Sequence, residues 1–280
     1  MADFQYCLNT STIRPASILE KIGIAGETGY SAIELWHDDI DDYLARGGSL
    51  HDVRQALIDQ DLALPTTISL KGWLDTTGAE HRRALDECQR RMDQAAELGA
   101  VHVIAGPSLG KVDRVLAAIN YSELLELGIE RGVEPALEYL GFAEDINSIE
   151  AAIEIIAATG HPAATIVHDP FHIFRGGGSI ESIAKLSGNT IAICHFNDAP
   201  ANPPRHEQHD KDRVMPGDGH LDLRRMLALL RQVGYGGYLS LELFREDLWS
   251  RDPREVARLG LEKMRRLVET EGGVTRAEDG

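Results

Sequence analysis

Eight short apolar segments, rich in β-branched residues, alternate along the chain with longer stretches of helical periodicity. The 280 residues give each strand–helix unit about 35 residues, which fits a (β/α)8 barrel with a usual total of roughly 250 residues. The expected strands are Phe4–Asn9, Ala32–Trp36, Ala63–Ser69, Val101–Ala105, Glu134–Tyr139, Ala164–His168, Thr190–Phe196 and Tyr238–Leu243. The pattern therefore predicts an α/β fold closed into a barrel.

A doubly wound sheet is the alternative to this barrel. Such a sheet normally has five or six strands and a glycine-rich fingerprint after the first one, where this chain has Asn9-Thr10-Ser11-Thr12. We therefore expect a single (β/α)8 TIM barrel domain over residues 1–270, followed by a polar, flexible C-terminal tail over residues 271–280. A Pro- and His-rich insertion, Ala199–Gly219, separates the seventh strand from its helix, and loops of this length are usually functional.

Ionisable side chains end four consecutive predicted strands. They are Glu138, Asp169, His195 and Glu242, at spacings of 31, 26 and 47 residues. Barrel enzymes build their sites at the carboxyl ends of the strands, so these groups should meet at one mouth. Three carboxylates gathered there would repel one another unless a cation lay among them. Their oxygen-rich donor set predicts one divalent metal ion, Mn²⁺, Zn²⁺, Co²⁺ or Mg²⁺.

Four motifs carry a resemblance to a known family. They are Asp169-Pro170-Phe171-His172, Gly178-Ser179-Ile180-Glu181-Ser182, residues 212–219 (Asp-Arg-Val-Met-Pro-Gly-Asp-Gly), and Ser240-Leu241-Glu242-Leu243-Phe244-Arg245. The chain resembles the xylose-isomerase-like barrels of sugar isomerases and epimerases, and among them the inosose isomerase group. The resemblance implies that Glu138, Asp169, His195 and Glu242 bind one metal, and that His172 and Arg213 contact substrate oxygens. The family pattern also makes Glu138 and Glu242 the catalytic acid and base.

The expected activity is isomerisation or epimerisation of a sugar or an inosose, a cyclic polyol ketone, by proton transfer through a metal-bound enediolate. A metal-dependent hydro-lyase, of the inosose or dehydroshikimate dehydratase type, and a ketose 3-epimerase begin with the same proton abstraction and remain alternatives. An abasic-site endonuclease is a more remote alternative, because the net charge of −17 opposes binding to nucleic acid.

Other positions near the predicted mouth carry weaker signals. Trp36 is expected to form an apolar wall for the substrate, and Lys71 and Trp73 follow the third strand toward the same mouth. The acidic run Asp38–Asp42 reads as a solvated loop before a helix. His168 should point away from Asp169, because side chains alternate along a strand.

Amino-acid composition limits which cellular compartment and which binding partners we expect. Cys7, Cys88 and Cys194 are few and far apart, which favours reduced thiols and a cytoplasmic enzyme. No apolar run approaches the ~20 residues of a membrane span, and the N-terminus lacks a signal pattern. We expect a small polyol or sugar as substrate, with neither nucleic acid nor membrane as a partner, and leave assembly into a homo-oligomer open.

Overall fold

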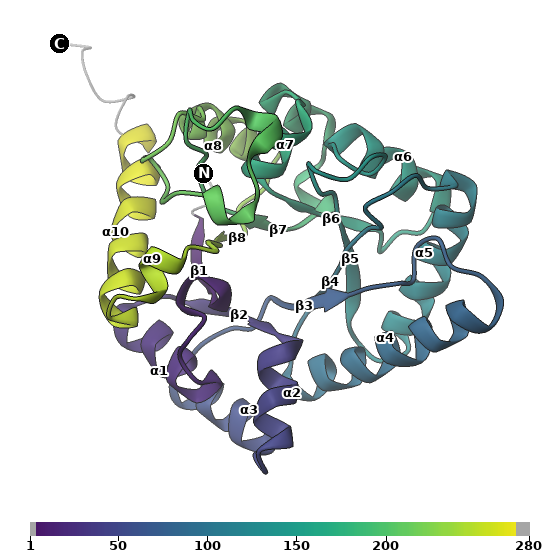
Figure 1. Cartoon of the computed structure of the whole chain (residues 1–280), viewed down its shortest axis with the longest axis horizontal. Helices are drawn as coiled ribbons and strands as arrows, with labels where there is room; N and C mark the ends of the chain where they lie inside the picture. Colours follow the sequence, from purple (N-terminus) through teal and green to yellow (C-terminus); the bar gives the residue numbers. More distant parts are fainter. Residues whose placement is uncertain (1–3, 273–280) are drawn as a thin grey trace.

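Eight parallel strands close into a barrel in the computed structural model of the chain, which describes residues 4–272 (Figure 1). Each strand pairs with the next, and β8 returns to β1, where Leu8 lies opposite Leu241. The strands are β1 (Gln5–Asn9), β2 (Ala32–Trp36), β3 (Thr66–Leu70), β4 (His102–Ala105), β5 (Glu134–Glu138), β6 (Thr165–His168), β7 (Ile191–His195) and β8 (Tyr238–Leu241). The predicted (β/α)8 barrel is confirmed.

The helices form a ring outside the strands (Figure 1). They are α1 (Ile18–Thr28), α2 (His37–Ala45), α3 (Leu50–Asp59), α4 (Gly78–Leu98), α5 (Arg114–Ile129), α6 (Ile149–Thr159), α7 (Pro170–Gly176), α8 (Leu223–Gln232), α9 (Glu246–Trp249) and α10 (Pro253–Gly272). Two of them, α1 and α4, end on Gly29 and Gly99 in the left-handed conformation that glycine adopts without strain. No helix of residues 4–272 combines the length and apolar character that a membrane crossing requires.

The two faces of the strands pack into two separate apolar layers. Ile104 and Val167 belong to a small cluster inside the barrel, whereas the alternate residues Val103 and Ile166 belong to the large layer between strands and helices. This division follows from the two-residue repeat of a strand. Because both faces are buried, parallel strands read as continuous apolar runs, and the polar residues that interrupt them stand out.

Two local predictions were wrong. The acidic run after β2 is not a loop but lies in α2. Asp38 and Asp39 occupy its first turn, where their negative charges interact favourably with the positive end of the helix dipole. Trp73 is fully buried against Tyr121 and does not reach the mouth. The predicted tail, 271–280, lies outside the described residues apart from the two at the end of α10.

Candidate metal centre

The carboxyl ends of β5 to β8 bring four predicted residues together. Glu138 ends β5, Asp169 follows β6, His195 ends β7 and Glu242 follows β8. Each of them offers one ligand atom, and these atoms lie within 4.8 Å of one another. Asp169, His195 and Glu242 are buried, and Glu138 is half-buried. We call this group the four-residue cluster.

The ring of His195 is oriented toward the three carboxylates of the cluster. Its Nδ1 lies 3.0 Å from Glu242 Oε2 and 3.5 Å from both Glu138 Oε1 and Asp169 Oδ2. This buried nitrogen makes no hydrogen bond to any described residue. Burial alone would lower the pKa of His195, but the carboxylates of Glu242 and Glu34 raise it well above its usual value. The site therefore attracts positive charge at Nδ1.

These observations test whether the cluster fits a divalent metal. A buried imidazole nitrogen without a hydrogen bond and three converging carboxylates form the donor set of Zn²⁺, Mn²⁺ or Co²⁺ sites in proteins. The ligand atoms are close enough together to surround one ion. The residues fit a single divalent cation, which Glu138, Asp169, His195 and Glu242 would hold.

Arg213 is the cation that the chain itself places beside the cluster. Its Nη1 donates to Asp169 Oδ2 at 2.8 Å and to Glu242 Oε2 at 2.5 Å, and its Nη2 donates to Asp210 Oδ1 at 2.7 Å. The guanidinium also lies over the ring of Phe171, 4.9 Å from the centroid. Burial would lower the pKa of Arg213, but these carboxylates raise it, so Arg213 stays charged.

Two residues of the site were missed from the sequence. Glu34, in β2, is fully buried, and its carboxylate lies 3.4 Å from His195 Nε2. It also accepts hydrogen bonds from Thr66 and Ser240. Asn9, at the end of β1, donates from Nδ2 to Glu34 and to Glu242, each at 3.1 Å. Both are polar residues in otherwise apolar strands, and this pattern could have identified them from the sequence.

Glu34 is placed to accept a hydrogen bond from His195 Nε2. A carboxylate that accepts from Nε2–H leaves the Nδ1 lone pair free for a metal, as is usual for metal-binding histidines. Glu34→Gln should therefore weaken binding of Zn²⁺ or Mn²⁺ by about 10- to 100-fold while the fold is kept. Calorimetric titration of the metal-stripped protein measures this, with circular dichroism as the check on folding. Glu27→Gln, on the exposed face of α1, is the control; equal affinities for the two variants would refute the role of Glu34.

A cavity of about 380 Å³ opens above the cluster at the mouth of the barrel. Of the four cluster residues, only Glu138 and Glu242 line it. Of the predicted substrate contacts, Trp36, His172 and Arg213 all line it, and so does Lys71. The cluster thus presents two glutamates to the cavity, with Asp169 and His195 beneath them.

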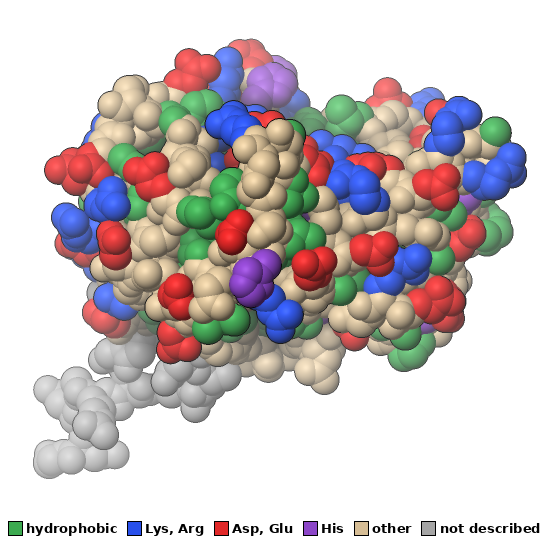
Figure 2. Space-filling model, turned by 90° about the horizontal axis from the view of Figure 1, so that it is seen from below, with side chains coloured by type: hydrophobic (Ala, Val, Ile, Leu, Met, Phe, Trp, Pro, Cys, Tyr) green, Lys and Arg blue, Asp and Glu red, His purple; other side chains and the backbone are tan. Residues whose placement is uncertain are grey.

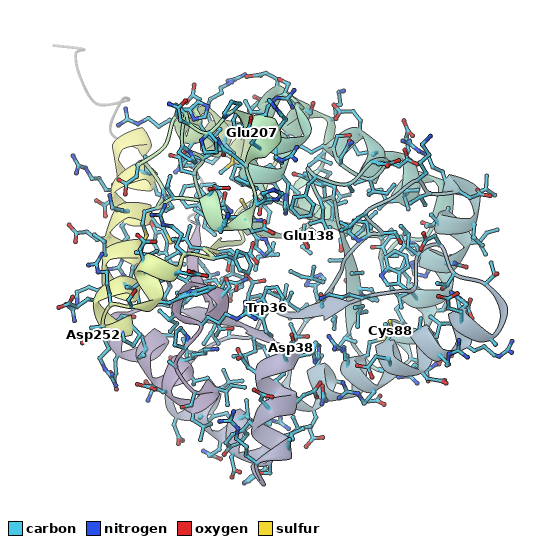
Figure 3. All side chains as sticks on the ribbon, in the orientation of Figure 1. Trp36, Asp38, Cys88, Glu138, Glu207 and Asp252 are labelled. Atoms are coloured by element: carbon cyan, nitrogen blue, oxygen red, sulfur yellow. The ribbon has the colours of Figure 1, made fainter. Side chains whose placement is uncertain are left out.

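Trp36 and His172 are held in the cavity wall by hydrogen bonds. Trp36 Nε1 donates to Asn9 Oδ1 at 2.9 Å, and the indole meets Phe244 edge-on. Trp36 and Glu138 both lie toward the centre of the ring of strands in Figure 3. His172 lies in α7, where its Nδ1 accepts from the Gly141 amide at 3.2 Å and its Nε2 lies 3.0 Å from Arg213 Nη2.

The remaining histidines near the mouth do not join the cluster. His168 is buried, its Nδ1 lies 3.3 Å from the Tyr139 hydroxyl, and burial lowers its pKa to about 4. It lies outside the four-residue cluster. His206 and His209, in the Pro-rich insertion, are exposed.

Comparison with known proteins places the chain among enzymes of this architecture. The Xylose isomerase-like TIM barrel family model matches residues 22–267. An inosose isomerase of Bacillus velezensis is 27% identical over 94% of this chain and 96% of its own length. A 3-dehydroshikimate dehydratase of Pseudomonas putida is 26% identical over 89% of this chain but only 40% of its own length.

A solved structure with the same fold contains a bound metal. The crystal structure of the IOLI protein with a zinc atom superposes with a TM-score of 0.88, at 26% identity, covering 96% of this chain and 99% of that one. Together with the family match over most of the chain, this likeness shows that the protein belongs to the xylose isomerase-like TIM barrel family.

Proposed function

We propose that the protein is a divalent-metal-dependent isomerase of cyclic polyol ketones, with an inosose as substrate. The observation that carries this proposal is the division of the cluster: Glu138 and Glu242 face the cavity, while Asp169 and His195 lie beneath. A substrate in the cavity therefore meets two carboxylates from two separate strands. The identity to inosose isomerases over nearly the full chain supports the choice of substrate.

The proposed reaction moves a carbonyl group to the adjacent, hydroxyl-bearing carbon. Glu242 removes the proton from the hydroxyl-bearing carbon, Glu138 returns a proton to the former carbonyl carbon, and the hydroxyl proton passes to the former carbonyl oxygen. A divalent ion held by the cluster would supply positive charge to the substrate oxygens as they become negative. Arg213 and His172 bind and orient hydroxyl or carbonyl oxygens from the same wall. Trp36 and Phe244 offer an apolar surface to the carbon face of the ring.

A hydro-lyase is the second candidate function, supported by the similarity to a 3-dehydroshikimate dehydratase. It would use the same base but would lose a hydroxyl group from the neighbouring carbon instead of returning a proton. An endonuclease finds less support, because acidic and basic side chains are interspersed on the face in Figure 2, without a continuous basic surface there.

Deuterium exchange tests the proposed reaction directly. The metal-loaded protein in deuterated water should place deuterium on the carbon next to the carbonyl of an inosose, because the proton removed by a carboxylate exchanges with solvent. Mass spectrometry and NMR of the product measure this. Water loss from the substrate would instead identify a hydro-lyase. Transfer of a position-specific label between carbons, without exchange at any pH, would exclude carboxylate-mediated proton transfer.

We also propose that the protein works in the cytoplasm. Cys7, Cys88 and Cys194 are all buried and free, and unpaired thiols are typical of a reducing compartment. The zinc bound to the related IOLI protein makes Zn²⁺ the first divalent ion to test by metal analysis of the purified protein.

A further inference from the structure

A second cavity of about 240 Å³ adjoins the one above the cluster. The two share Trp36, Lys71 and Phe244 in their walls. The rings of Trp36 and Phe244 meet edge-on, with centroids 5.8 Å apart, where the cavities adjoin. We call the second cavity the side compartment; its other charged residues are Arg14, Asp38 and Asp39. A substrate whose carbonyl end lies over the cluster extends toward this compartment.

Each acidic residue of the side compartment already has a cation beside it. Asp39 Oδ2 lies 2.7 Å from the ammonium group of Lys21, which is completely buried. Asp38 lies 3.8 Å from the guanidinium of Arg91. In the main cavity, Asp210 is paired with Arg213 in the same way. The carboxylates of these walls are therefore largely balanced by the chain's own cations.

The two cations of the side compartment lack such partners. Neither Arg14 nor Lys71 forms an ion pair with any residue between positions 4 and 272. Arg14 instead lies over the ring of Trp249, 5.7 Å from its centroid. Ser11, in the same wall, is buried with a hydroxyl group that has no hydrogen-bond partner among the described residues. Two exposed cations without an ion pair, beside a buried hydroxyl group without a hydrogen bond, form a wall that suits an anion.

We propose that Arg14 and Lys71 bind a carboxylate on the substrate, at the end away from the four-residue cluster. This inference rests on the proposed function, because it assumes that the ketone end occupies the main cavity. It widens the substrate class from neutral inososes to polyol ketones that carry a carboxylate.

Two sugars that differ in one group test the proposal. Fructose and fructuronate share the ketone and the neighbouring hydroxyl groups, but fructuronate ends in a carboxylate. The zinc-loaded protein should bind fructuronate about tenfold more tightly at low ionic strength, and added salt should reduce this preference. Isothermal titration calorimetry gives both dissociation constants without requiring turnover.

Two variants distinguish direct binding by Arg14 and Lys71 from the long-range effect of positive charge. In Arg14→Met/Lys71→Met the ratio of the two dissociation constants should fall close to one, because the carboxylate of fructuronate loses both cations. Arg245→Met is the control: it removes a positive charge next to Phe244 from a residue that lines neither cavity and is paired with Asp247. This variant should keep the preference.

The outcomes distinguish this proposal from the proposed function. Equal binding of the two sugars by the unmodified protein, or a preference that survives in the double variant, would overturn the anion subsite alone. If neither sugar binds and no inosose exchanges its protons, the proposed function and the subsite fail together.

Discussion

Glu242→Gln should lower turnover by at least ~10² at saturating metal, because the variant loses the carboxylate that removes the substrate proton. It should also weaken metal binding. Glu242 accepts hydrogen bonds from Arg213 at one oxygen and from Asn9 at the other, so an amide nitrogen would face a donor in either orientation. Turnover of an inosose therefore has to be measured over a range of metal concentrations.

Two further variants make this result interpretable. Glu138→Gln changes the other glutamate of the cavity. This variant should also lose turnover. Its effect on metal binding should be smaller, because Glu138 has a single ion-pair contact among the described residues, with His195. Glu246→Gln, exposed at the start of α9, should behave as the unmodified protein. Turnover by Glu242→Gln within a few-fold of normal would remove Glu242 from the reaction.

Arg213→Met should lower the free energy of unfolding by about 3–5 kcal/mol in the metal-free protein. Arg213 is buried against three carboxylates, those of Asp169, Asp210 and Glu242. Without it, these groups must stay close together with only the imidazole of His195 to balance them, or must take up protons. A divalent ion should recover part of the loss, because it supplies positive charge to the same carboxylates and binds the folded state.

Chemical denaturation with and without metal measures this effect. Arg225→Met removes an arginine that pairs with Glu181 on the exposed surface, and it should leave stability nearly unchanged because solvent screens such pairs. A loss below about 1 kcal/mol for Arg213→Met would mean that the buried carboxylates are balanced in some other way.

The barrel could be predicted because each strand is signalled locally. An apolar run such as Ile191–His195 is short, β-branched and bounded by polar residues, and eight of these runs leave little choice of architecture. Helix α2 was missed for the opposite reason. Its four aspartates have low helix propensity and hide the helical spacing of Ile40, Tyr43 and Leu44. The buried ammonium of Lys21 beside Asp39 is a tertiary contact that the sequence does not signal.

The same distinction between local patterns and tertiary contacts applies to the candidate site. The four cluster residues could be predicted to meet because parallel strands bring their carboxyl ends to one mouth, so position along each strand was sufficient. Asn9 and Glu34 required knowledge of which face of β1 and β2 points inward. The hydrogen bond from Asn9 to Glu242 joins residues 233 positions apart, a distance over which local patterns carry no information.

Asp169 uses its two oxygens for different purposes. Oδ1 accepts from the backbone amides of Phe171 and His172 and so begins helix α7, while Oδ2 faces Arg213 and His195. One carboxylate thus sets both the charge of the cluster and the direction of the helix that carries His172. Replacing Asp169 would therefore remove the cap of α7 and displace the imidazole of His172, in addition to changing the charge of the four-residue cluster.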